Sequence, residues 1–322
     1  DAQESRGLGD VYKRQTKKDT IMTRIKNWSV SILLAGAMLW GLQSYSASSL
    51  KFAQVSDVHF YTGQNNTTFK MIAESPKLLD DVIDQINSTP NVSFVMFTGD
   101  QIDKSFEKEL SAFLPHTTKL NAPWYFAFGN HDTCIGGYLT PALYMQLVNE
   151  YNKNHKFEKS YYSFVPQKGY KAIVLDTIIR DRLTSNGRLG EQQLAWLDNE
   201  IKNSSKDVIL IFMHVPVLEP YNSPNHRLLD ADKMEEILNK YKNPIAVFQG
   251  HYHGAKITQR DNILYVSCPA LVSYPNAFRM ITVTNYRTKV VFDIQNKETR
   301  LKDIQKLAKL LVFGSTIYTG EE

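Results

Sequence analysis

From residue 50 to residue 253, short apolar runs alternate with amphipathic segments, and this alternation limits the possible folds more than any other feature. Short apolar runs bounded by polar residues predict buried strands, and the segments between them predict helices that cover a sheet. Strands that alternate with helices predict an α/β fold with mostly parallel strands. The predicted strands are Lys51–Ser56, Ser93–Thr98, Trp124–Phe128, Lys171–Asp176, Val208–Met213 and Ile245–Gln249.

The predicted helices carry apolar residues at helical spacing. Pro141 after Thr140 is typical of a first helical turn that follows an N-cap residue. The helices are expected at Pro76–Asn87, Ser105–Leu114, Pro141–Asn152, Gly190–Asn203 and Ala231–Tyr241.

After His253 the pattern changes to strands without intervening helices, which favours antiparallel pairing. A last helix is predicted at Leu301–Leu311. We expect one domain over residues 50–298, followed by a C-terminal helix and tail over residues 299–322. The late strands are predicted at Ala255–Gln259, Asn262–Ser267, Phe278–Thr284 and Lys289–Ile294.

The N-terminal region reads as a signal peptide over residues 22–49. Arg24 and Lys26 precede the apolar run Trp28–Leu42, and small residues follow it. A basic start, a short apolar core and a small-residue exit predict cleavage, here after Ser46 or Ser49. The alternative is an uncleaved anchor helix, because the uncharged stretch is just long enough to span a bilayer. Cleavage implies an exported protein, periplasmic or secreted, without a stable membrane anchor.

The first 21 residues fit no signal pattern, and residues 9–15 resemble a translated sequencing adapter. We interpret residues 1–21 as a non-native or sequencing-derived extension, with a natural extension as the alternative. The formal net charge of +4 depends on this region. Seven of the 37 Lys and Arg residues and four of the 33 Asp and Glu residues lie in the first 49 positions, which leaves 30 basic and 29 acidic residues. The charge therefore indicates no nucleic-acid or membrane partner.

The chain has two cysteines, Cys134 and Cys268. Export would place them in an oxidising compartment, where they could pair. Two free thiols are the alternative, because pairing requires close Cα atoms that a sequence does not show.

Polar side chains with metal-ligand chemistry follow five of the predicted strands, at the point where each strand ends. Ligands of α/β sheets bind outside the carboxyl ends of the strands. A single Asp or His at such a position is usually a turn residue, but five successive cases make that reading improbable. The segments are Asp57-Val58-His59, Gly99-Asp100 with Asp103, Gly129-Asn130-His131-Asp132, His214, and Gly250-His251-Tyr252-His253.

Mixed imidazole and carboxylate ligands predict a transition-metal site. If Asp57 and His59 continue a strand, alternation places both on one face. The same argument places His251 and His253 together and turns Tyr252 away from them. Glycines before Asp100, Asn130 and His251 would allow sharp turns and close approach of the backbone.

The ordered set DxH, GDxxD, GNHD, H and GHxH resembles the calcineurin-like metallophosphoesterases. The resemblance implies a four-layer α/β/β/α sandwich with a dinuclear metal centre. It implies two divalent or trivalent ions, which could be Mn, Fe, Zn, Co or Ni, and a hydroxide held between them that attacks phosphorus. Carried over by motif, one ion is expected at Asp57, His59, Asp100 and His253, and the other at Asp100, Asn130, His214 and His251.

The same resemblance implies that His131 binds the substrate phosphate beside Asn130 and protonates or stabilises the leaving oxygen. Asp103 is expected to orient His131. Lys104 is a further candidate for substrate binding. Protein Ser/Thr phosphatases carry Arg-Gly at the position of Lys104 and Ser105, and lysine cannot bind phosphate bidentately.

The chain is most similar to bacterial cyclic-nucleotide and glycerophosphodiester phosphodiesterases, which implies a phosphodiesterase of small phosphoesters. Purple acid phosphatases place a tyrosine ligand where Asp103 stands, so an iron–tyrosine centre is not expected. Many members of the phosphodiesterase group have a second His after the single ligand His, whereas Val215 follows His214. A phosphomonoesterase with the same metals is the alternative, and a non-catalytic scaffold on this fold is a minor one.

Two loops are candidates for the rim of the site. The Pro- and Asn-rich segment 219–227 follows His214 and contains His226, a candidate substrate contact. Residues 61–70, after the first motif, form the second. A plain surface loop is the alternative reading of segment 219–227.

Overall fold

The computed structural model describes residues 47–312 apart from residues 68 and 287. The described residues belong to one compact unit, Tyr45–Glu322. The predicted extension over residues 1–21 and nearly all of the predicted signal peptide lie outside the described residues, as does the tail after residue 312.

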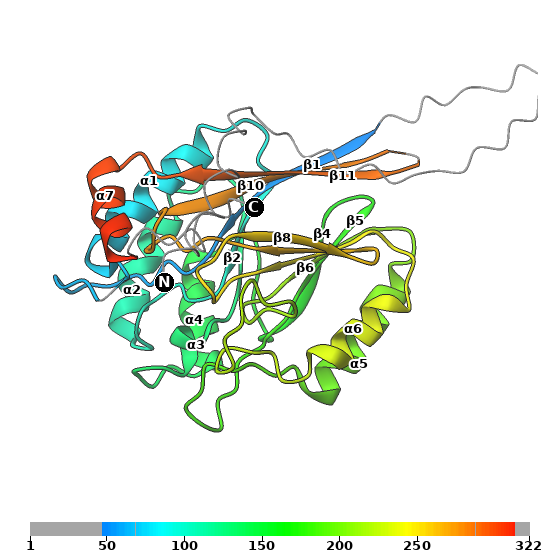
Figure 1. The fold of residues 1–322 in the computed structure, drawn as a ribbon, viewed down its shortest axis with the longest axis horizontal. Helices are drawn as coiled ribbons and strands as arrows, with labels where there is room; N and C mark the ends of the chain where they lie inside the picture. Colours follow the sequence, from blue (N-terminus) through cyan, green and yellow to red (C-terminus); the bar gives the residue numbers. More distant parts are fainter. Residues whose placement is uncertain (1–46, 68, 287, 313–322) are drawn as a thin grey trace, which may run out of the picture. The chain divides into compact units, whose positions relative to one another are not determined.

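Eleven described strands form two sheets (Figure 1). The first sheet has the order β11-β10-β1-β2-β3 and the second has the order β4-β5-β6-β7-β9-β8. The first contains β1 (Ser48–Val55), β2 (Phe94–Thr98), β3 (Trp124–Ala127), β10 (Ala277–Asn285) and β11 (Val290–Glu298). The second contains β4 (Tyr162–Gln167), β5 (Tyr170–Val174), β6 (Val208–Phe212), β7 (Ile245–Gln249), β8 (Lys256–Arg260) and β9 (Ile263–Ser267).

Two sheets pack face to face through an aromatic core. Phe52 on β1 stacks on Phe94 of β2, with ring centroids 4.8 Å apart. Across the interface, Phe52 lies edge-on to Phe212 and Phe248 of the second sheet, at 5.6 and 5.2 Å. Neighbouring Ala53 points the other way and joins the core under the helices. Both faces of β1 are therefore buried over residues 52–55.

Helices cover the outer face of each sheet, which confirms the predicted four-layer α/β/β/α sandwich (Figure 1). Thr140 caps α4 as predicted, because its hydroxyl accepts a hydrogen bond from the Leu143 amide at 3.2 Å. No helix in residues 47–312 is both long and apolar enough to cross a bilayer. The helices are η1 (Ile72–Glu74), α1 (Ser75–Asn87), α2 (Glu107–Thr117), α3 (Asn130–Thr133), α4 (Pro141–Tyr151), α5 (Gly190–Asn203), α6 (Ala231–Asn239) and α7 (Lys302–Leu311).

The structure corrects two sequence predictions of sheet structure. β4 was not predicted; it contains Pro166 and lies at a sheet edge, where a missing amide donor breaks no ladder. Antiparallel pairing is right between β9 and β8 but wrong for the other neighbour of β9, because β9 runs parallel to β7. It is right for β10, which pairs antiparallel with both β1 and β11.

Candidate metal centre

All seven predicted metal ligands are buried and lie just beyond strand ends that face one another across the two sheets. β1, β2 and β3 run parallel within the first sheet, and β6 and β7 run parallel within the second. Their carboxyl ends therefore deliver side chains to one place. The residues are Asp57, His59, Asp100, Asn130, His214, His251 and His253.

Strand alternation, the reason predicted for the pairing of Asp57 with His59 and of His251 with His253, is wrong, although each pair does lie together. β1 ends at Val55, so Asp57 and His59 do not continue a strand. Their φ angles are 53° and 41°, and those of His251 and His253 are 71° and 57°. This left-handed region is costly for residues with a Cβ and persists where the surroundings over-determine it. Left-handed turns, rather than strand alternation, bring these ligands together.

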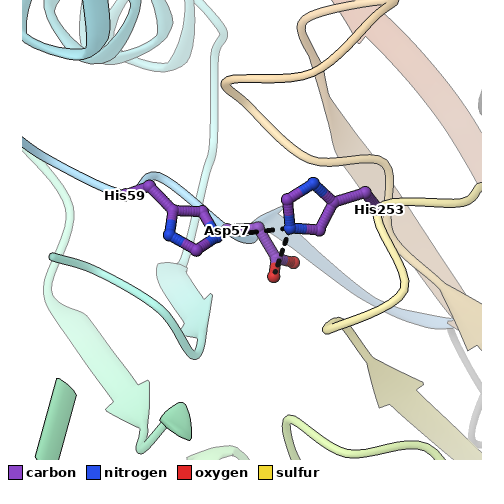
Figure 2. Close-up of side chains that lie close together, drawn as sticks. All are labelled: Asp57, His59 and His253. Atoms are coloured by element: carbon purple, nitrogen blue, oxygen red, sulfur yellow. Dashed lines mark hydrogen bonds and ion pairs between the residues drawn. The ribbon is translucent and has the colours of Figure 1, made fainter. Parts of the chain in front are cut away.

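The first group consists of Asp57, His59 and His253, whose polar atoms face one another (Figure 2). Nε2 of His253 lies 3.2 Å from Nε2 of His59 and 3.4 Å from Oδ1 of Asp57. Nδ1 of His253 is 2.8 Å from the Ser273 hydroxyl, which fixes the ring with Nε2 toward the group.

The second group consists of Asp100, His214 and His251, with Asn130 beside it. Nε2 of His214 lies 3.1 Å from Nδ1 of His251 and 3.1 Å from Oδ1 of Asn130. Carboxylate, imidazole and amide side chains thus bring their donor atoms around a common point.

Asp100 joins the two groups through one oxygen. Its Oδ2 lies 3.5 Å from Nε2 of His59 and 3.4 Å from Nε2 of His214. Its Oδ1 accepts a hydrogen bond from the His131 amide at 2.9 Å, which holds the carboxylate in this orientation. One carboxylate oxygen therefore faces a histidine of each group.

Hydrogen bonds on the far side of the imidazoles set their tautomers. Nδ1 of His214 lies 2.9 Å from the Thr98 carbonyl oxygen, which can only accept, so Nδ1 carries the proton. Nδ1 of His59 lies 3.1 Å from Oδ1 of Asp103 and donates to that carboxylate in the same way. In the neutral form of each ring, Nε2 then keeps a lone pair directed into the site, as a metal ligand requires, and a bound metal ion would take the place of a second proton.

The charges of the site favour a bound cation. Burial would raise the pKa of Asp100, but His214 and the other neighbouring imidazoles outweigh burial and hold the pKa well below its usual range. Burial would lower the pKa of His214, but the Asp100 and Asp57 carboxylates raise it to about 9. Burial, with the charge of Lys70, lowers the pKa of His59 to about 3, so this imidazole is neutral at physiological pH. The negative potential that keeps a proton on His214 also attracts a metal ion.

Buried polar atoms that lack hydrogen-bond partners indicate whether these residues could bind two metal ions. Among the described residues, Oδ1 of Asp57 is buried and forms no hydrogen bond. An unpaired buried polar atom costs about 1–3 kcal/mol, so such atoms call for a partner. In addition, Nε2 of His59 and Nε2 of His253 face each other at 3.2 Å. The donor set fits two cations of the transition-metal type.

His131 lies beside the two groups, and its ring centroid is 4.6 Å from that of His59. Its Nδ1 donates to the main-chain carbonyl oxygen of Asp103 at 2.6 Å. The carboxylate of Asp103 instead lies 3.1 Å from His59 Nδ1 and from the Lys70 ammonium. Asp103 therefore contacts His131 as expected, but through its backbone.

A cavity of about 280 Å³ opens over the two groups. Lys104 does not line it: this exposed side chain has its ammonium 5.6 Å from the Tyr61 ring centroid. His226 does line it, and so does Tyr252, which was expected to face away. The lining residues are His59, Phe69, Lys70, Asp100, Asn130, His131, Ser185, Tyr221, Ser223, His226, His251, Tyr252 and His253.

The sequence predicted only some of the residues that line this cavity. Both loops that were considered as rims, residues 61–70 and 219–227, contribute side chains to the cavity. No local motif marks Lys70 or Ser185, because each reaches the cavity from a loop whose path depends on tertiary contacts.

Glycine at position 99 is required by both conformation and space. Gly99 has a φ of 94°, and a Cβ added there would overlap the His214 ring. The backbone after β2 must therefore pass close to this imidazole, as the glycine before Asp100 suggested.

The two cysteines are free thiols in the structure. Cys268 is buried, which raises the pKa of its thiol to about 12. Cys134 is half-buried near the carbonyl oxygen of Arg182. Of the two alternatives left open by the sequence, a disulfide and two free thiols, the structure has two free thiols.

Comparison with known proteins agrees with this geometry. The family model described as calcineurin-like phosphoesterase matches residues 50–255. A probable glycerophosphodiester phosphodiesterase of Arcobacter nitrofigilis is 23% identical over 219 residues, which cover 66% of this chain and 76% of the relative. A probable cyclic nucleotide phosphodiesterase of Colwellia psychrerythraea is 25% identical over 237 residues, covering 69% of this chain and 80% of the relative.

Among solved structures, a dimetal phosphatase from Danio rerio is similar, with a TM-score of 0.59 and 17% sequence identity. The match covers 78% of this chain and 98% of that chain. At this identity the likeness concerns the fold, and it agrees with the two-sheet architecture.

Proposed function

The chain belongs to the calcineurin-like phosphoesterase family of metal-dependent hydrolases, and we propose that it acts as a phosphodiesterase on small phosphodiesters. The observation that carries this proposal is the single Asp100 oxygen that faces a histidine of each metal-ligand group, with His131 adjacent. The two relatives above are named as phosphodiesterases, which supports the diester preference.

Two bound metal ions would supply activated water and withdraw charge from the phosphoryl group. One ion would be held by Asp57, His59, Asp100 and His253. The other would be held by Asp100, Asn130, His214 and His251. The ligand set is compatible with Mn, Fe, Zn, Co or Ni, and metal availability decides among them.

His131 is suited to move a proton. Because its Nδ1 donates to a carbonyl oxygen, the ring orientation is fixed and Nε2 is the atom left for exchange. A protonated Nε2 within reach of the leaving oxygen would supply the proton that an alkoxide needs. Asn130, which also lines the cavity, would present its amide donors to a phosphoryl oxygen.

The part of the cavity wall formed by Tyr221, Tyr252 and His226 offers surface for a second ester group. Tyr221 and Tyr252 pack edge to face with centroids 5.0 Å apart, and the Tyr221 hydroxyl donates to the Tyr252 carbonyl oxygen at 2.7 Å. His226 lies beside them, held by a 2.7 Å contact between its Nδ1 and the Ser223 hydroxyl. A diester, unlike a monoester, has a second substituent to place against this wall.

A phosphomonoesterase is the second candidate, favoured by the extra cation that Lys70 brings to the cavity. Hydrolysis of bis(p-nitrophenyl) phosphate and p-nitrophenyl phosphate by the metal-loaded protein separates the two. We expect the higher kcat/KM for the diester, and a strong monoester preference would contradict the proposal. The scaffold alternative gains no support, since the predicted ligands and His131 lie together.

We further propose that the protein is exported, periplasmic or secreted. The signal pattern over residues 22–49 supports this, and β1 begins at Ser48. Cleavage after Ser46 leaves β1 whole, whereas cleavage after Ser49 removes Ser48 and Ser49, which pair with β10. N-terminal sequencing of the mature protein is expected to begin at Ala47, and an intact N-terminus would contradict export by cleavage.

A further inference from the structure

The cavity contains one charged side chain that the metal-ligand motifs do not include. Lys70 is the only Lys or Arg among the cavity-lining residues of the described chain. Its side chain is 15% exposed, and its ammonium lies 3.1 Å from Oδ1 of Asp103. A mostly desolvated ammonium in a wall that must receive an anion is a candidate binding group.

The backbone that carries Lys70 is held at both ends of its loop. The amide and hydroxyl of Thr62 donate to the buried carboxylate of Glu109 at 2.8 and 2.9 Å. Directly after Lys70, the Met71 amide donates to the Val272 carbonyl oxygen at 2.7 Å. The position of the ammonium is therefore built by tertiary contacts rather than left to a free surface chain.

The Lys70 ammonium has more N–H donors than its contacts within the described residues use. Lysine carries three N–H donors, and the contact with Asp103 uses one of them. Nδ1 of His59 is 3.4 Å away, but it donates its own proton to Asp103 and so does not accept one from Lys70. Two donors therefore remain for a group that enters the cavity.

His131 and Lys70 are both fixed on Asp103, one through the carbonyl oxygen and the other through the carboxylate. Their polar ends consequently belong to the same wall. Without Lys70, the Asp103 carboxylate, 8% exposed, would present a less compensated negative charge to an anionic substrate. In a partly desolvated site such a charge acts strongly over a few ångströms.

We propose that the Lys70 ammonium donates a hydrogen bond to a non-bridging oxygen of the substrate phosphoryl group, a contact that a diester and a monoester can both make and that strengthens with the negative charge of the bound group. Asp103 holds the ammonium in place for this contact. The inference rests on the proposed phosphoesterase function of the same cavity, but it concerns binding, which can be measured without turnover.

Calorimetric titration of the metal-loaded protein with inorganic phosphate and with dimethyl phosphate tests the contact. Removing a hydrogen bond to a charged group costs about tenfold or more in affinity. We expect Lys70→Gln to weaken phosphate binding at least about 10-fold and dimethyl phosphate binding less, because the latter carries one negative charge. Lys70→Arg should stay within about 3-fold of the unaltered protein, since it keeps the charge. Lys104→Gln removes an exposed lysine outside the cavity and should change the phosphate affinity by less than about 2-fold.

Metal content is measured on each variant by plasma emission spectrometry. Unchanged phosphate affinity in Lys70→Gln would overturn the proposal, as would an equal loss for both ligands. Weaker binding accompanied by metal loss would also overturn it, because Lys70 would then act through Asp103 and His59. Phosphate binding that depends on Lys70 in a protein that hydrolyses no diester would support the contact and reject the proposed phosphodiesterase function.

Discussion

The main-chain carbonyl oxygen of Asp103, and not its carboxylate, accepts the hydrogen bond from Nδ1 of His131, at 2.6 Å. The carboxylate lies 3.1 Å from Nδ1 of His59 instead. One residue thus positions the candidate acid through its backbone and a candidate metal ligand through its side chain. Side-chain substitution separates the two roles.

Asp103→Ala should weaken metal binding and spare the orientation of His131. Loss of a carboxylate that supports a ligating imidazole typically lowers metal affinity about 10- to 100-fold. At saturating metal, the dependence of rate on the leaving group should match that of the unaltered protein, because the carbonyl oxygen is still present. Metal titration followed by kinetics on a series of aryl phosphodiesters measures both. Full metal affinity with a steeper leaving-group dependence would mean that the carboxylate orients His131 after all.

His131→Ala should keep the metal content and slow the reaction most for poor leaving groups. Loss of a positioned acid costs about 10²- to 10⁴-fold where the leaving oxygen needs a proton, and less for p-nitrophenol. The comparison is kcat for alkyl and aryl diesters at saturating metal. His116→Ala is the control, because His116 pairs with Asp80 on the helical surface. Equal losses for good and poor leaving groups would reject the proton-donor role.

Gly99→Ala should displace His214 and lower metal binding. A Cβ at this position overlaps the His214 ring, and the φ of 94° adds backbone strain of about 1–3 kcal/mol. Gly169→Ala is a matched control, because its φ is 89° but nothing lies within 4 Å of an added Cβ. Urea unfolding gives the stability loss of each variant, and metal analysis gives the ligand loss. The steric account fails if the two variants lose stability equally and both retain their metals.

Chelation should lower the thermal stability of the metal-loaded protein. Oδ1 of Asp57 is buried without a hydrogen-bond partner among the described residues, and Nε2 of His59 and Nε2 of His253 face each other at 3.2 Å. A metal at about 1,000 times its dissociation constant stabilises a fold by roughly 4 kcal/mol, which corresponds to a Tm change of at least about 5 °C. Calorimetry before and after dialysis against a chelator measures the change. An identical Tm would show that these residues hold no metal in the native protein.

The sequence predicted the ligands and their convergence at strand ends better than the local backbone conformation that pairs them. Asp57 and His59 were recognised because carboxylate and imidazole follow an apolar run, and such runs are typical of buried strands. The left-handed φ angles at both residues were not foreseeable, since they depend on contacts such as the Asp57 and His59 amides donating to the Gly99 and Asp100 carbonyl oxygens at 3.1 and 2.8 Å. The positions of loop side chains could not be predicted from the sequence for the same reason.

Lys104 and Lys70 show that the sequence does not determine which loop side chains reach the cavity. Lys104 was considered because it follows a motif, yet the structure places it on the surface over Tyr61. Lys70 follows no motif and reaches the cavity because Glu109 and Val272 hold its loop. The order of strands in the second sheet also depends on contacts between distant segments. No local pattern predicts that β9 pairs parallel with β7.

The central claim is a dinuclear centre in which Asp100 serves both metals, and metal analysis of Asp100→Ala tests it most directly. Its Oδ2 lies 3.5 Å from Nε2 of His59 and 3.4 Å from Nε2 of His214, so its loss should affect both sites. The unaltered protein should hold two metal ions per chain, and Asp100→Ala should lose both together with hydrolysis of bis(p-nitrophenyl) phosphate. Two metals and full turnover in Asp100→Ala would contradict the shared ligand.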